Sequence, residues 1–489
     1  MPLQAIYYQM KVKDFFTILI ILLIALSLRL YKINTPLADF HSWRQVDTAA
    51  VSRNFVNKEF NIFKPVYDDV SSIQSGLENP KGLRFVEFPL YNATVAVLYK
   101  YLPVVPLEIY GRIVTIFSSL ILIFIIYYFL RLEVGYGAAI VGSLIYSIFP
   151  FFVFFSRVFL PDTTSLSMAF ISIFFTYLYS KTHKRGVSSI YFLLGAITFS
   201  LGVLIKPTVA FYLLPIVYLY YKKHGLSIFK SAFFYLFLLI TFVPFIFWRS
   251  YIANFPEGVP AFDWLIDRVN TSEGMVNIFF RPAFFRWIFF ERINNIILGG
   301  YLTFFFILGI FYKQKKFFLY SILTSAILYL FTFQGGNIQH EYYQIMILPP
   351  LAMFSALGIA YIIRYGKQLI SPLFSLILTL IIVSFSLLVS FNYVKNYYGF
   401  SQDLVNISKI IKDLTGKDEL VITDTIGDTT LLYLSERRGS PAPYNDLPTM
   451  KEKGYSYFVT MNREVADKVV FETNFKIVFQ NEKFTLFKL

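Results

Sequence analysis

The side chains best suited to chemistry gather in one short run after the first apolar segment. Residues 39–55 read DFHSWRQVDTAAVSRNF and hold two carboxylates, Asp39 and Asp47. The run also holds groups that can donate hydrogen bonds or stack on a ligand, namely His41, Trp43, Arg44 and Gln45. A partly desolvated carboxylate near cations can act as a general base. In the alternative without a functional site, both acids are solvated loop residues, or Asp47 is a charge at the end of a helix. Clustered donors and an aromatic ring beside the acids favour a site.

Three further charged residues are predicted to serve the same chemistry. Glu87, in RFVEFPLY, ends the loop that begins with this run, either as a catalytic or substrate-orienting group or as an interfacial carboxylate. Arg112 and Lys206 fall within apolar segments. Cations in a membrane usually line a polar cavity or meet an anion, although they can also extend toward the interface. Both could contact a phosphate; the alternative for each is a side chain that extends toward the interface.

Two other motifs fall at the ends of apolar segments. FSRVFLPD places Arg157 and Asp162 on a turn bent by Pro161, as an internal ion pair or as a phosphate-facing arginine held by the aspartate. QHEYYQ places three aromatic rings at the start of an apolar segment, those of His340, Tyr342 and Tyr343. These rings either contact substrate or form part of an aromatic belt at the membrane surface.

The composition excludes a soluble protein. Of 489 residues, 56% are apolar and 15% are charged, and the mean hydropathy is +0.58, which indicates a polytopic membrane protein. The net charge of +14 comes with lysines and arginines beside apolar segments, so it indicates membrane topology and not nucleic-acid binding. No cysteine is present, which excludes disulfides and thiolate metal sites. His41 and His340 with Asp39 or Glu341 could bind a divalent metal, but their spacing gives no ligand signature.

About eleven apolar segments are long enough to be membrane helices. They lie near residues 15–31, 108–130, 136–154, 162–180, 188–205, 207–221, 228–248, 293–312, 317–333, 342–363 and 369–391. Every short loop on one predicted side is basic, which makes that side, with the N-terminus, cytoplasmic. Of thirty carboxylates only Asp14 and Glu133 fall there. The sequence therefore predicts a plasma-membrane protein whose site faces outward.

Two regions outside the spans are predicted to fold. In the first outer loop, Ser42 and Gln45 suggest a capping box for a helix from Trp43 to about Val56, and residues 88–102 suggest a short interfacial helix. After residue 391 the charge rises and helical and strand patterns alternate. We expect a transmembrane domain at 1–391 and an extracytoplasmic α/β domain at 392–489.

The order of the motifs resembles a known family. HSWRQVDTAAVSRNF, EFPLY, SRVFLPD, LIKP and HEYYQ before a prolyl span are similar to prokaryotic GT-C glycosyltransferases related to protein O-mannosyltransferases and the lipid A aminoarabinose transferase. The resemblance implies a helical bundle with juxtamembrane helices. It also implies inverting transfer of a hexosyl or pentosyl group from a polyprenyl-phosphate donor to a hydroxyl or phosphate acceptor.

The chain departs from the family at the acidic pair that follows the first span in many members. Counting from the span, Asp39 matches; counting back from Arg53, the pair falls on Arg44 and Gln45 and leaves Asp47 as the nearest acid. The resemblance therefore implies that Asp39 or Asp47 is the catalytic aspartate.

The hypothesis is an integral-membrane glycosyltransferase. Asp39 or Asp47 deprotonates the acceptor, Glu87 orients a substrate, and cations neutralise the departing polyprenyl phosphate, so that no metal is required. A transporter or flippase of lipid-linked sugars is the alternative; it predicts internal repeats, which the sequence does not show. A noncatalytic subunit that binds glycolipid is a third reading.

Overall fold

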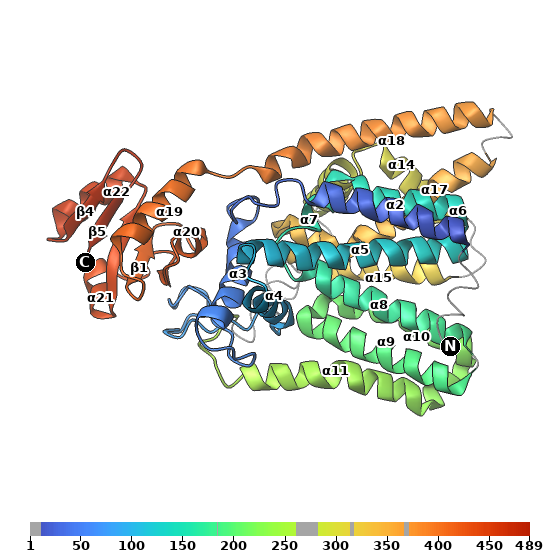
Figure 1. Cartoon of the computed structure of the whole chain (residues 1–489), viewed down its shortest axis with the longest axis horizontal. Coiled ribbons are helices and arrows are strands. Elements are labelled where there is room, and N and C mark those ends of the chain that lie inside the picture. Colours follow the sequence, from blue (N-terminus) through green and yellow to red (C-terminus); the bar gives the residue numbers. More distant parts are fainter. Residues whose placement is uncertain (1–10, 183, 261–281, 313–316, 366–370) are drawn as a thin grey trace. The chain divides into compact units, whose positions relative to one another are not determined.

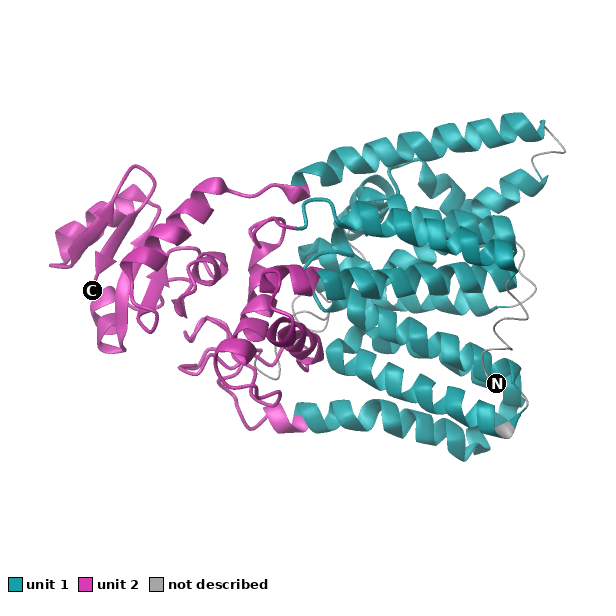
Figure 2. Cartoon of the chain, viewed as in Figure 1, with its two compact units in different colours: residues 1–33, 113–249, 265–396 teal, residues 34–112, 250–264, 397–489 magenta. Residues whose placement is uncertain are grey.

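The computed structural model describes residues 11–182, 184–260, 282–312, 317–365 and 371–489 (Figure 1). The chain divides into two compact units (Figure 2). Unit 1 comprises residues 1–33, 113–249 and 265–396, and unit 2 comprises residues 34–112, 250–264 and 397–489. Unit 2 thus joins the first loop to the C-terminal residues. The predicted functional division into 1–391 and 392–489 stays a prediction.

Unit 1 is a bundle of apolar helices. Its helices are α2 (Val12–Arg29), α6 (Tyr136–Ile148), α7 (Pro150–Phe155), α8 (Asp162–Lys181), α9 (Arg185–Ile205), α10 (Leu213–His224), α14 (Leu302–Phe311), α15 (Phe318–Thr332), α16 (Gln334–Gln339), α17 (Leu348–Tyr365) and α18 (Pro372–Val394). It also contains the short α13 (Pro282–Phe285), the π-helix η4 (Arg286–Ile297) and the 3-10 helices η1 (Pro207–Tyr212), η2 (Gly225–Lys230) and η5 (Glu341–Ile347). The helix α5 (Leu107–Glu133) begins in unit 2, and α11 (Ala232–Ile252) ends there.

Prolines end helices at two places in unit 1, and the first of these lies within a predicted span. Phe149 precedes Pro150 and is extended, which separates α6 from α7 within the predicted span 136–154. Lys206 precedes Pro207 and is also extended, so α9 ends there and η1 begins. The ring of a proline disfavours helical backbone at the residue before it. The same chemistry therefore shortens the helices and leaves Lys206 at a break.

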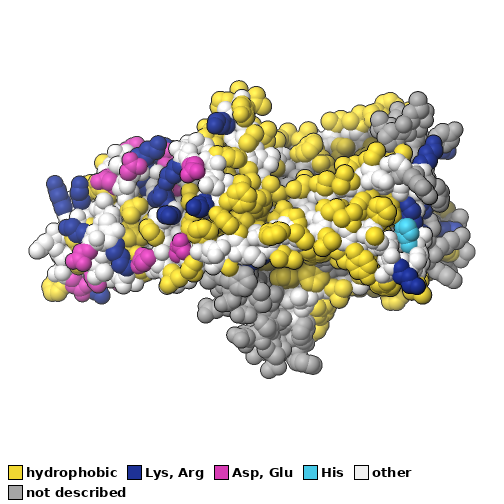
Figure 3. Space-filling view, turned by 90° about the horizontal axis from the view of Figure 1, so that it is seen from below, with side chains coloured by type: hydrophobic (Ala, Val, Ile, Leu, Met, Phe, Trp, Pro, Cys, Tyr) yellow, Lys and Arg dark blue, Asp and Glu magenta, His cyan; other side chains and the backbone are white. Residues whose placement is uncertain are grey.

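The multi-pass character is confirmed, but the predicted count of about eleven spans is not. Among the described residues, five helical stretches are long and apolar enough to cross a bilayer: Leu107–Glu133, Gly186–Ile205, Ala232–Ile252, Glu341–Tyr365 and Pro372–Leu414. A sixth arises if Pro282–Ile297 and Leu302–Phe311, bent by 113°, form one span. Side chains that face outward from α18 are large and apolar, as lipid contact requires, including Leu373, Phe385 and Leu388. Figure 3 shows hydrophobic side chains over much of one face of unit 1.

In unit 2 the first loop forms the two predicted helices. They are α3 (Ser42–Asn57) and α4 (Leu90–Tyr101). The predicted capping box is wrong. The N-cap is His41, whose φ of 57° lies in the left-handed region, and no side chain caps the helix. The Gln45 amide instead donates to Asp39 Oδ1 at 2.6 Å and to the Phe40 carbonyl oxygen at 3.0 Å. A tertiary contact thus replaces the local cap.

The C-terminal residues form the predicted mixture of strands and helices. Five strands, β1 (Leu420–Thr423), β2 (Gly439–Ser440), β3 (Tyr455–Thr460), β4 (Lys476–Gln480) and β5 (Thr485–Lys488), form a sheet in the order β2-β1-β3-β5-β4. The strand β1 is parallel to β2 and β3, whereas β5 is antiparallel to β3 and β4. Its helices are α19 (Gln402–Leu414), α20 (Thr430–Leu434), α21 (Leu447–Glu452) and α22 (Arg463–Glu472).

The edge of this sheet is joined to the first loop. Gly439 N donates to the Asp68 carbonyl oxygen at 2.9 Å, and Val70 N donates to the Gly439 carbonyl oxygen at 2.8 Å. A paired edge does not recruit other strands. These bonds help to fold the first loop and the C-terminal residues as one unit.

Candidate active site

Asp47 lies at a polar centre built from three segments of unit 2. Its Oδ2 is 3.1 Å from Arg84 Nη2, and its Oδ1 accepts a hydrogen bond of 2.5 Å from Thr429 Oγ1. The Asp47 side chain is only 2% exposed. Burial raises the pKa of Asp47 above its usual range, against the opposing effects of Arg84, Thr429 and Arg44. A carboxylate with a raised pKa is a better proton acceptor at neutral pH than an ordinary aspartate.

A second ion pair stands one helical turn before Asp47. Arg44 and Glu87 form a salt bridge in which both side chains are largely buried. Residues three apart in a helix share a face, so α3 presents Arg44 beside Asp47. The helix α4 packs behind, where the Asn92 amide donates to the Thr48 carbonyl oxygen at 2.6 Å. The predicted residues Arg44, Asp47 and Glu87 are therefore brought together.

Asp39 has a different set of partners. Its Oδ2 is 3.6 Å from Arg112 Nη2, and its Oδ1 accepts from Gln45. Arg112 also donates to the Thr35 carbonyl oxygen at 2.6 Å. These contacts fasten the segment before α3 to the first turns of α5. The predicted aromatic residues lie close by in sequence: the His41 ring is 4.2 Å from the Phe40 ring, and Trp43 is half-buried in the first turn of α3.

Unit 1 holds a separate group of predicted residues at helix breaks. Lys206 Nζ is 2.5 Å from Asp162 Oδ1, and both side chains are nearly buried. Asp162 lies in the first turn of α8, where the helix dipole stabilises a negative charge. The same ammonium lies 5.4 Å from the centroid of the Tyr342 ring and 5.2 Å from that of Tyr343, within cation–π range.

Two more predicted residues belong to this part of unit 1. The His340 ring stacks on Tyr342 with centroids 5.4 Å apart and planes 8° apart. Arg157 is fully buried and donates to the Lys32 carbonyl oxygen at 2.9 Å. Asp162 thus pairs with Lys206, a partner that the FSRVFLPD motif alone did not suggest. The site residues of unit 1 place a lysine, an aspartate and stacked rings together.

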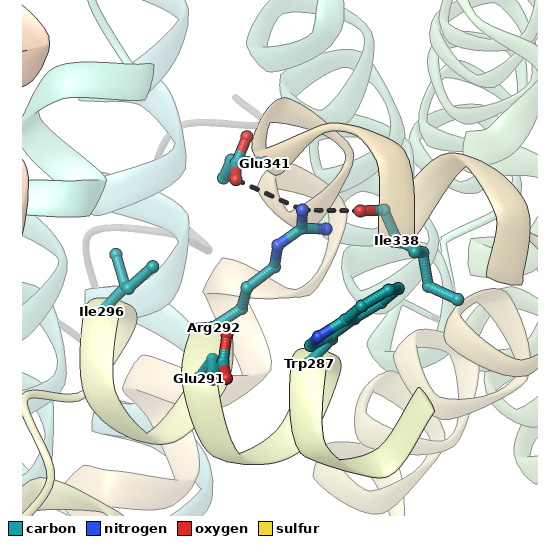
Figure 4. Close-up of a pocket in the computed structure, with 6 residues that line it drawn as sticks. All are labelled: Trp287, Glu291, Arg292, Ile296, Ile338 and Glu341. Atoms are coloured by element: carbon teal, nitrogen blue, oxygen red, sulfur yellow. Dashed lines mark hydrogen bonds and ion pairs between the residues drawn. The ribbon is translucent and has the colours of Figure 1, made fainter. Parts of the chain in front are cut away.

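A pocket adjoins the HEYYQ motif within unit 1 (Figure 4). Its volume is about 280 Å³, and its lining residues are Trp287, Glu291, Arg292, Ile296, Ile338 and Glu341. Arg292 donates to the Ile338 carbonyl oxygen at 2.6 Å and is 3.2 Å from Glu341 Oε1. Four lining residues come from η4, whose wider π-helical turns are frequent at functional sites.

Comparisons with known proteins agree with this architecture. Residues 106–248 match the family described as dolichyl-phosphate-mannose-protein mannosyltransferase. The chain is similar in structure to ArnT from Cupriavidus metallidurans bound to undecaprenyl phosphate, with a TM-score of 0.64, 13% identity, and 96% of this chain and 97% of that chain covered. The chain has the GT-C fold.

Other GT-C structures are also similar. Against Archaeoglobus fulgidus AglB, an archaeal oligosaccharyltransferase in complex with an inhibitory peptide and a dolichol-phosphate, the TM-score is 0.57 at 12% identity, covering 92% of this chain and 69% of that chain. No curated protein matches the chain in sequence. The predicted resemblance to GT-C membrane glycosyltransferases is confirmed, whereas the roles of the site residues stay predictions.

Several residues around the candidate site were missed in the sequence. Arg84 lies three residues before Glu87, so a cation near the predicted acid was visible there. Thr429 lies 382 residues after Asp47, and no local pattern links the two. Trp287 and Arg292 precede the apolar segment near 293–312 and belong to none of the motifs. Among the described residues, no group of three or more histidine and carboxylate side chains could hold a metal ion.

Proposed function

We propose that this chain is a glycosyltransferase that moves a sugar from a polyprenyl-phosphate donor to an acceptor outside the cytoplasm. The observation that carries the proposal is Asp47 held between Arg84 and Thr429, with Arg44 and Glu87 on the preceding turn. Such a preorganised carboxylate suits a general base. The GT-C fold supports the reaction class.

In the proposed reaction Asp47 takes the proton of an acceptor hydroxyl as the oxygen attacks the anomeric carbon of the sugar. The bond from that carbon to the phosphate oxygen breaks, and its electron pair leaves with the polyprenyl phosphate. Attack from the face opposite the leaving group inverts the anomeric carbon. Each carboxylate oxygen can accept two hydrogen bonds, so the bonds to Arg84 and Thr429 leave capacity on Asp47 for the acceptor proton.

Asp39 is assigned a positioning role, because its contacts with Arg112 and Gln45 fasten the start of α3. Glu87 holds Arg44, which orients substrate. In unit 1, Lys206 and Arg157 are assigned to the phosphate of the donor, and the rings of His340, Tyr342 and Tyr343 to its neighbouring groups. A cation at the leaving phosphate stabilises the charge that develops there.

The remaining assignments follow from this chemistry. The donor is a sugar on a polyprenyl phosphate, and the acceptor is a hydroxyl or phosphate group of a lipid, glycan or protein. A polyprenyl phosphate leaves as a stabilised anion, so no metal is required by the reaction as proposed. The basic loops assign the N-terminus to the cytoplasm and the site to the outer side of the plasma membrane.

The test uses membranes from cells that produce the full chain, given undecaprenyl-phosphate or dolichyl-phosphate linked [14C]mannose. The measured quantity is radioactivity released from the polyprenyl-phosphate pool. Asp47→Asn is expected to lower the rate about 10²–10⁴-fold, as loss of a general base does. Asp39→Asn is expected to retain measurable transfer, and Asp403→Asn, an exposed change on α19, to equal the unaltered chain.

Full activity of both Asp47→Asn and Asp39→Asn would overturn the assignment. In another outcome, the unaltered chain binds undecaprenyl phosphate but transfers no sugar from a mannose, a glucose or an aminoarabinose donor. That result would favour a transporter or a glycolipid-binding subunit. Loss of transfer in Asp39→Asn alone would move the base to Asp39.

A further inference from the structure

The C-terminal residues of unit 2 deliver one hydroxyl directly to Asp47. Thr429 lies immediately before α20 and donates to Asp47 Oδ1 at 2.5 Å, and both side chains are 2% exposed. The segment that carries it, residues 424–429, follows β1 (Figure 1). Thr429 therefore enters the surroundings of the proposed base from a part of the chain far removed in sequence.

The loop that ends at Thr429 is held in an unusual conformation. Ile426 has a φ of 52° and Gly427 a φ of 89°. A left-handed backbone costs a residue other than glycine about 1–2 kcal/mol, and for a β-branched residue it is rare. The backbone amides of Thr425 and Gly427 both donate to the Pro441 carbonyl oxygen, at 3.1 and 3.3 Å. Strain of this kind persists where the surroundings enforce it.

Other contacts dock α20 on α3 and on the start of α5 without involving Thr429. Tyr433 Oη donates to Glu108 Oε1 at 2.7 Å, and the Arg53 guanidinium lies 4.1 Å from the centroid of the Tyr433 ring. Thr430 Oγ1 is 3.0 Å from Ser42 Oγ. The position of α20 is thus fixed independently, so removal of the Thr429 hydroxyl need not displace the helix.

We propose that Thr429 is a positioning residue for Asp47: its hydroxyl fixes the carboxylate so that a free lone pair is directed at the acceptor hydroxyl. The proposal rests on the proposed function, in which Asp47 is the base. The strained loop from β1 to α20 then belongs to the active site. The C-terminal α/β segment contributes to the reaction by completing the surroundings of its base.

The charges around Asp47 determine how the loss of this hydroxyl is seen. Arg84 and Arg44 lower the pKa of Asp47, whereas Asp428 raises it. Asp69 and Tyr67 also interact with Asp47 electrostatically. The Thr429 hydrogen bond favours the ionised carboxylate and so lowers its pKa. Removing that bond raises the pKa, and the activity of a base then disappears at a higher pH as the medium is acidified.

The test compares Thr429→Val with Thr429→Ser and Thr430→Val in the transfer assay with undecaprenyl-phosphate [14C]mannose. Valine keeps the shape and removes the hydroxyl, serine keeps the hydroxyl, and Thr430→Val removes the neighbouring bond to α3 that does not reach Asp47. Thr429→Val is expected to lower kcat about 10–100-fold, the range for a hydrogen bond to a charged group, with KM for the donor unchanged. In the profile of kcat against pH, the acid limb of Thr429→Val is expected to move to higher pH.

Thr429→Ser is expected to restore both the rate and the acid limb, and Thr430→Val to leave the acid limb in place. An unchanged acid limb in Thr429→Val, or equal losses in Thr429→Val and Thr429→Ser, would overturn the positioning role. If Thr429→Val lowers the apparent Tm, the pH profile of the remaining activity decides. If Asp47→Asn is inactive and Thr429→Val is normal, only this inference is refuted. If Asp47→Asn is active, Asp47 is not the base, and the part of the proposed function on which this inference rests is refuted.

Discussion

At the scale of single residues, Asp69 is a carboxylate that the fold buries beside neutral hydrogen-bond donors. It accepts hydrogen bonds from Ser71 N at 2.8 Å and Ser71 Oγ at 2.6 Å, and Tyr67 Oη donates to it at 3.2 Å. Burial, with a smaller contribution from the charge of Asp47, raises the pKa of Asp69 from 3.8 to about 6. The folded protein therefore binds a proton at Asp69 more tightly than the unfolded chain does.

Because the folded state binds this proton more tightly, the free energy of unfolding depends on pH. The stabilisation is fully present below pH 4, where Asp69 is protonated in both states, and is lost as the pH rises through about 6. The change in pKa corresponds to about 3 kcal/mol. Asp69→Asn, which keeps an acceptor for Ser71 and removes the charge, is expected to raise the apparent Tm of the chain in detergent at pH 8 and to leave it unchanged near pH 4.

The matched control for this prediction is Asp467→Asn, which removes an exposed carboxylate from α22. It is expected to alter the apparent Tm little at either pH. If Asp69→Asn showed the same gap from the unaltered chain at pH 4 and pH 8, burial of its charge would not be the cause.

The buried pair of Lys206 and Asp162 gives a second prediction at this scale. Lys206→Met leaves the Asp162 carboxylate buried without its cation, and breaking a buried pair costs about 3–5 kcal/mol. The double variant Lys206→Met with Asp162→Asn removes both charges and is expected to recover most of the apparent Tm. Binding of undecaprenyl phosphate, followed by tryptophan fluorescence, should be weak in both variants.

Recovered stability with lost binding would separate the role of Lys206 in phosphate binding from its role in folding. A double variant as unstable as Lys206→Met would show that the ion pair itself, not the unpaired carboxylate, accounts for the loss. Full binding by the double variant would remove Lys206 from the phosphate site.

The polar residues of the candidate site stand out in the sequence, whereas their contacts do not. Residue types and motif order singled out Asp47, Glu87 and Lys206, whose roles stay predictions, because polar groups beside apolar segments are conspicuous. Their contacts with Arg84, Arg44 and Asp162 are tertiary, and such pairing is set by packing that a local pattern does not encode. The capping box at Ser42 failed for the same reason, since Gln45 found a partner in Asp39.

At the scale of elements, α14 and α17 cross through a reciprocal pair of glycines. A Cβ on Gly309 would lie 1.8 Å from the Phe354 carbonyl oxygen, and a Cβ on Gly358 would lie 1.8 Å from the Phe305 carbonyl oxygen. Small residues let membrane helices approach closely, where dispersion between backbones stabilises the pair. Each glycine therefore sits where the backbone of the opposite helix passes.

Gly309→Ala and Gly358→Ala are each expected to destabilise the bundle by about 1–3 kcal/mol, the usual range for overpacking. Gly137→Ala is the control, because a Cβ at that helical position in α6 meets nothing within 4 Å. Alanine favours a helix over glycine by about 1 kcal/mol, so Gly137→Ala should keep or raise the apparent Tm. Unfolding in detergent, followed by circular dichroism, measures all three. Unchanged Tm values for Gly309→Ala and Gly358→Ala would show that α14 and α17 can separate at this crossing at little cost in free energy.

At the scale of the whole molecule, the class of fold was predictable and the exact spans were not. Apolar composition and basic loops indicate a multi-pass protein because the bilayer imposes both. The breaks at Phe149 and Lys206 arise where proline excludes helical backbone from the residue before it. The predicted span 136–154 continues through the break at Phe149, so hydropathy alone overstated the length of that helix. The predicted spans 188–205 and 207–221 already left Lys206 between them.

The charge distribution of the whole chain makes a topology prediction that labelling can decide. The chain has no cysteine, so each introduced cysteine is the only one. Ser227→Cys lies in η2, beside the basic residues Lys222 and Lys223, and Lys483→Cys lies between β4 and β5; both positions are exposed. With the N-terminus cytoplasmic, a membrane-impermeant maleimide applied to intact cells should modify Lys483→Cys and leave Ser227→Cys unmodified until the cells are opened. Modification of Ser227→Cys in intact cells with protection of Lys483→Cys would invert the topology, and would place Asp47, whose unit contains residue 483, on the cytoplasmic side.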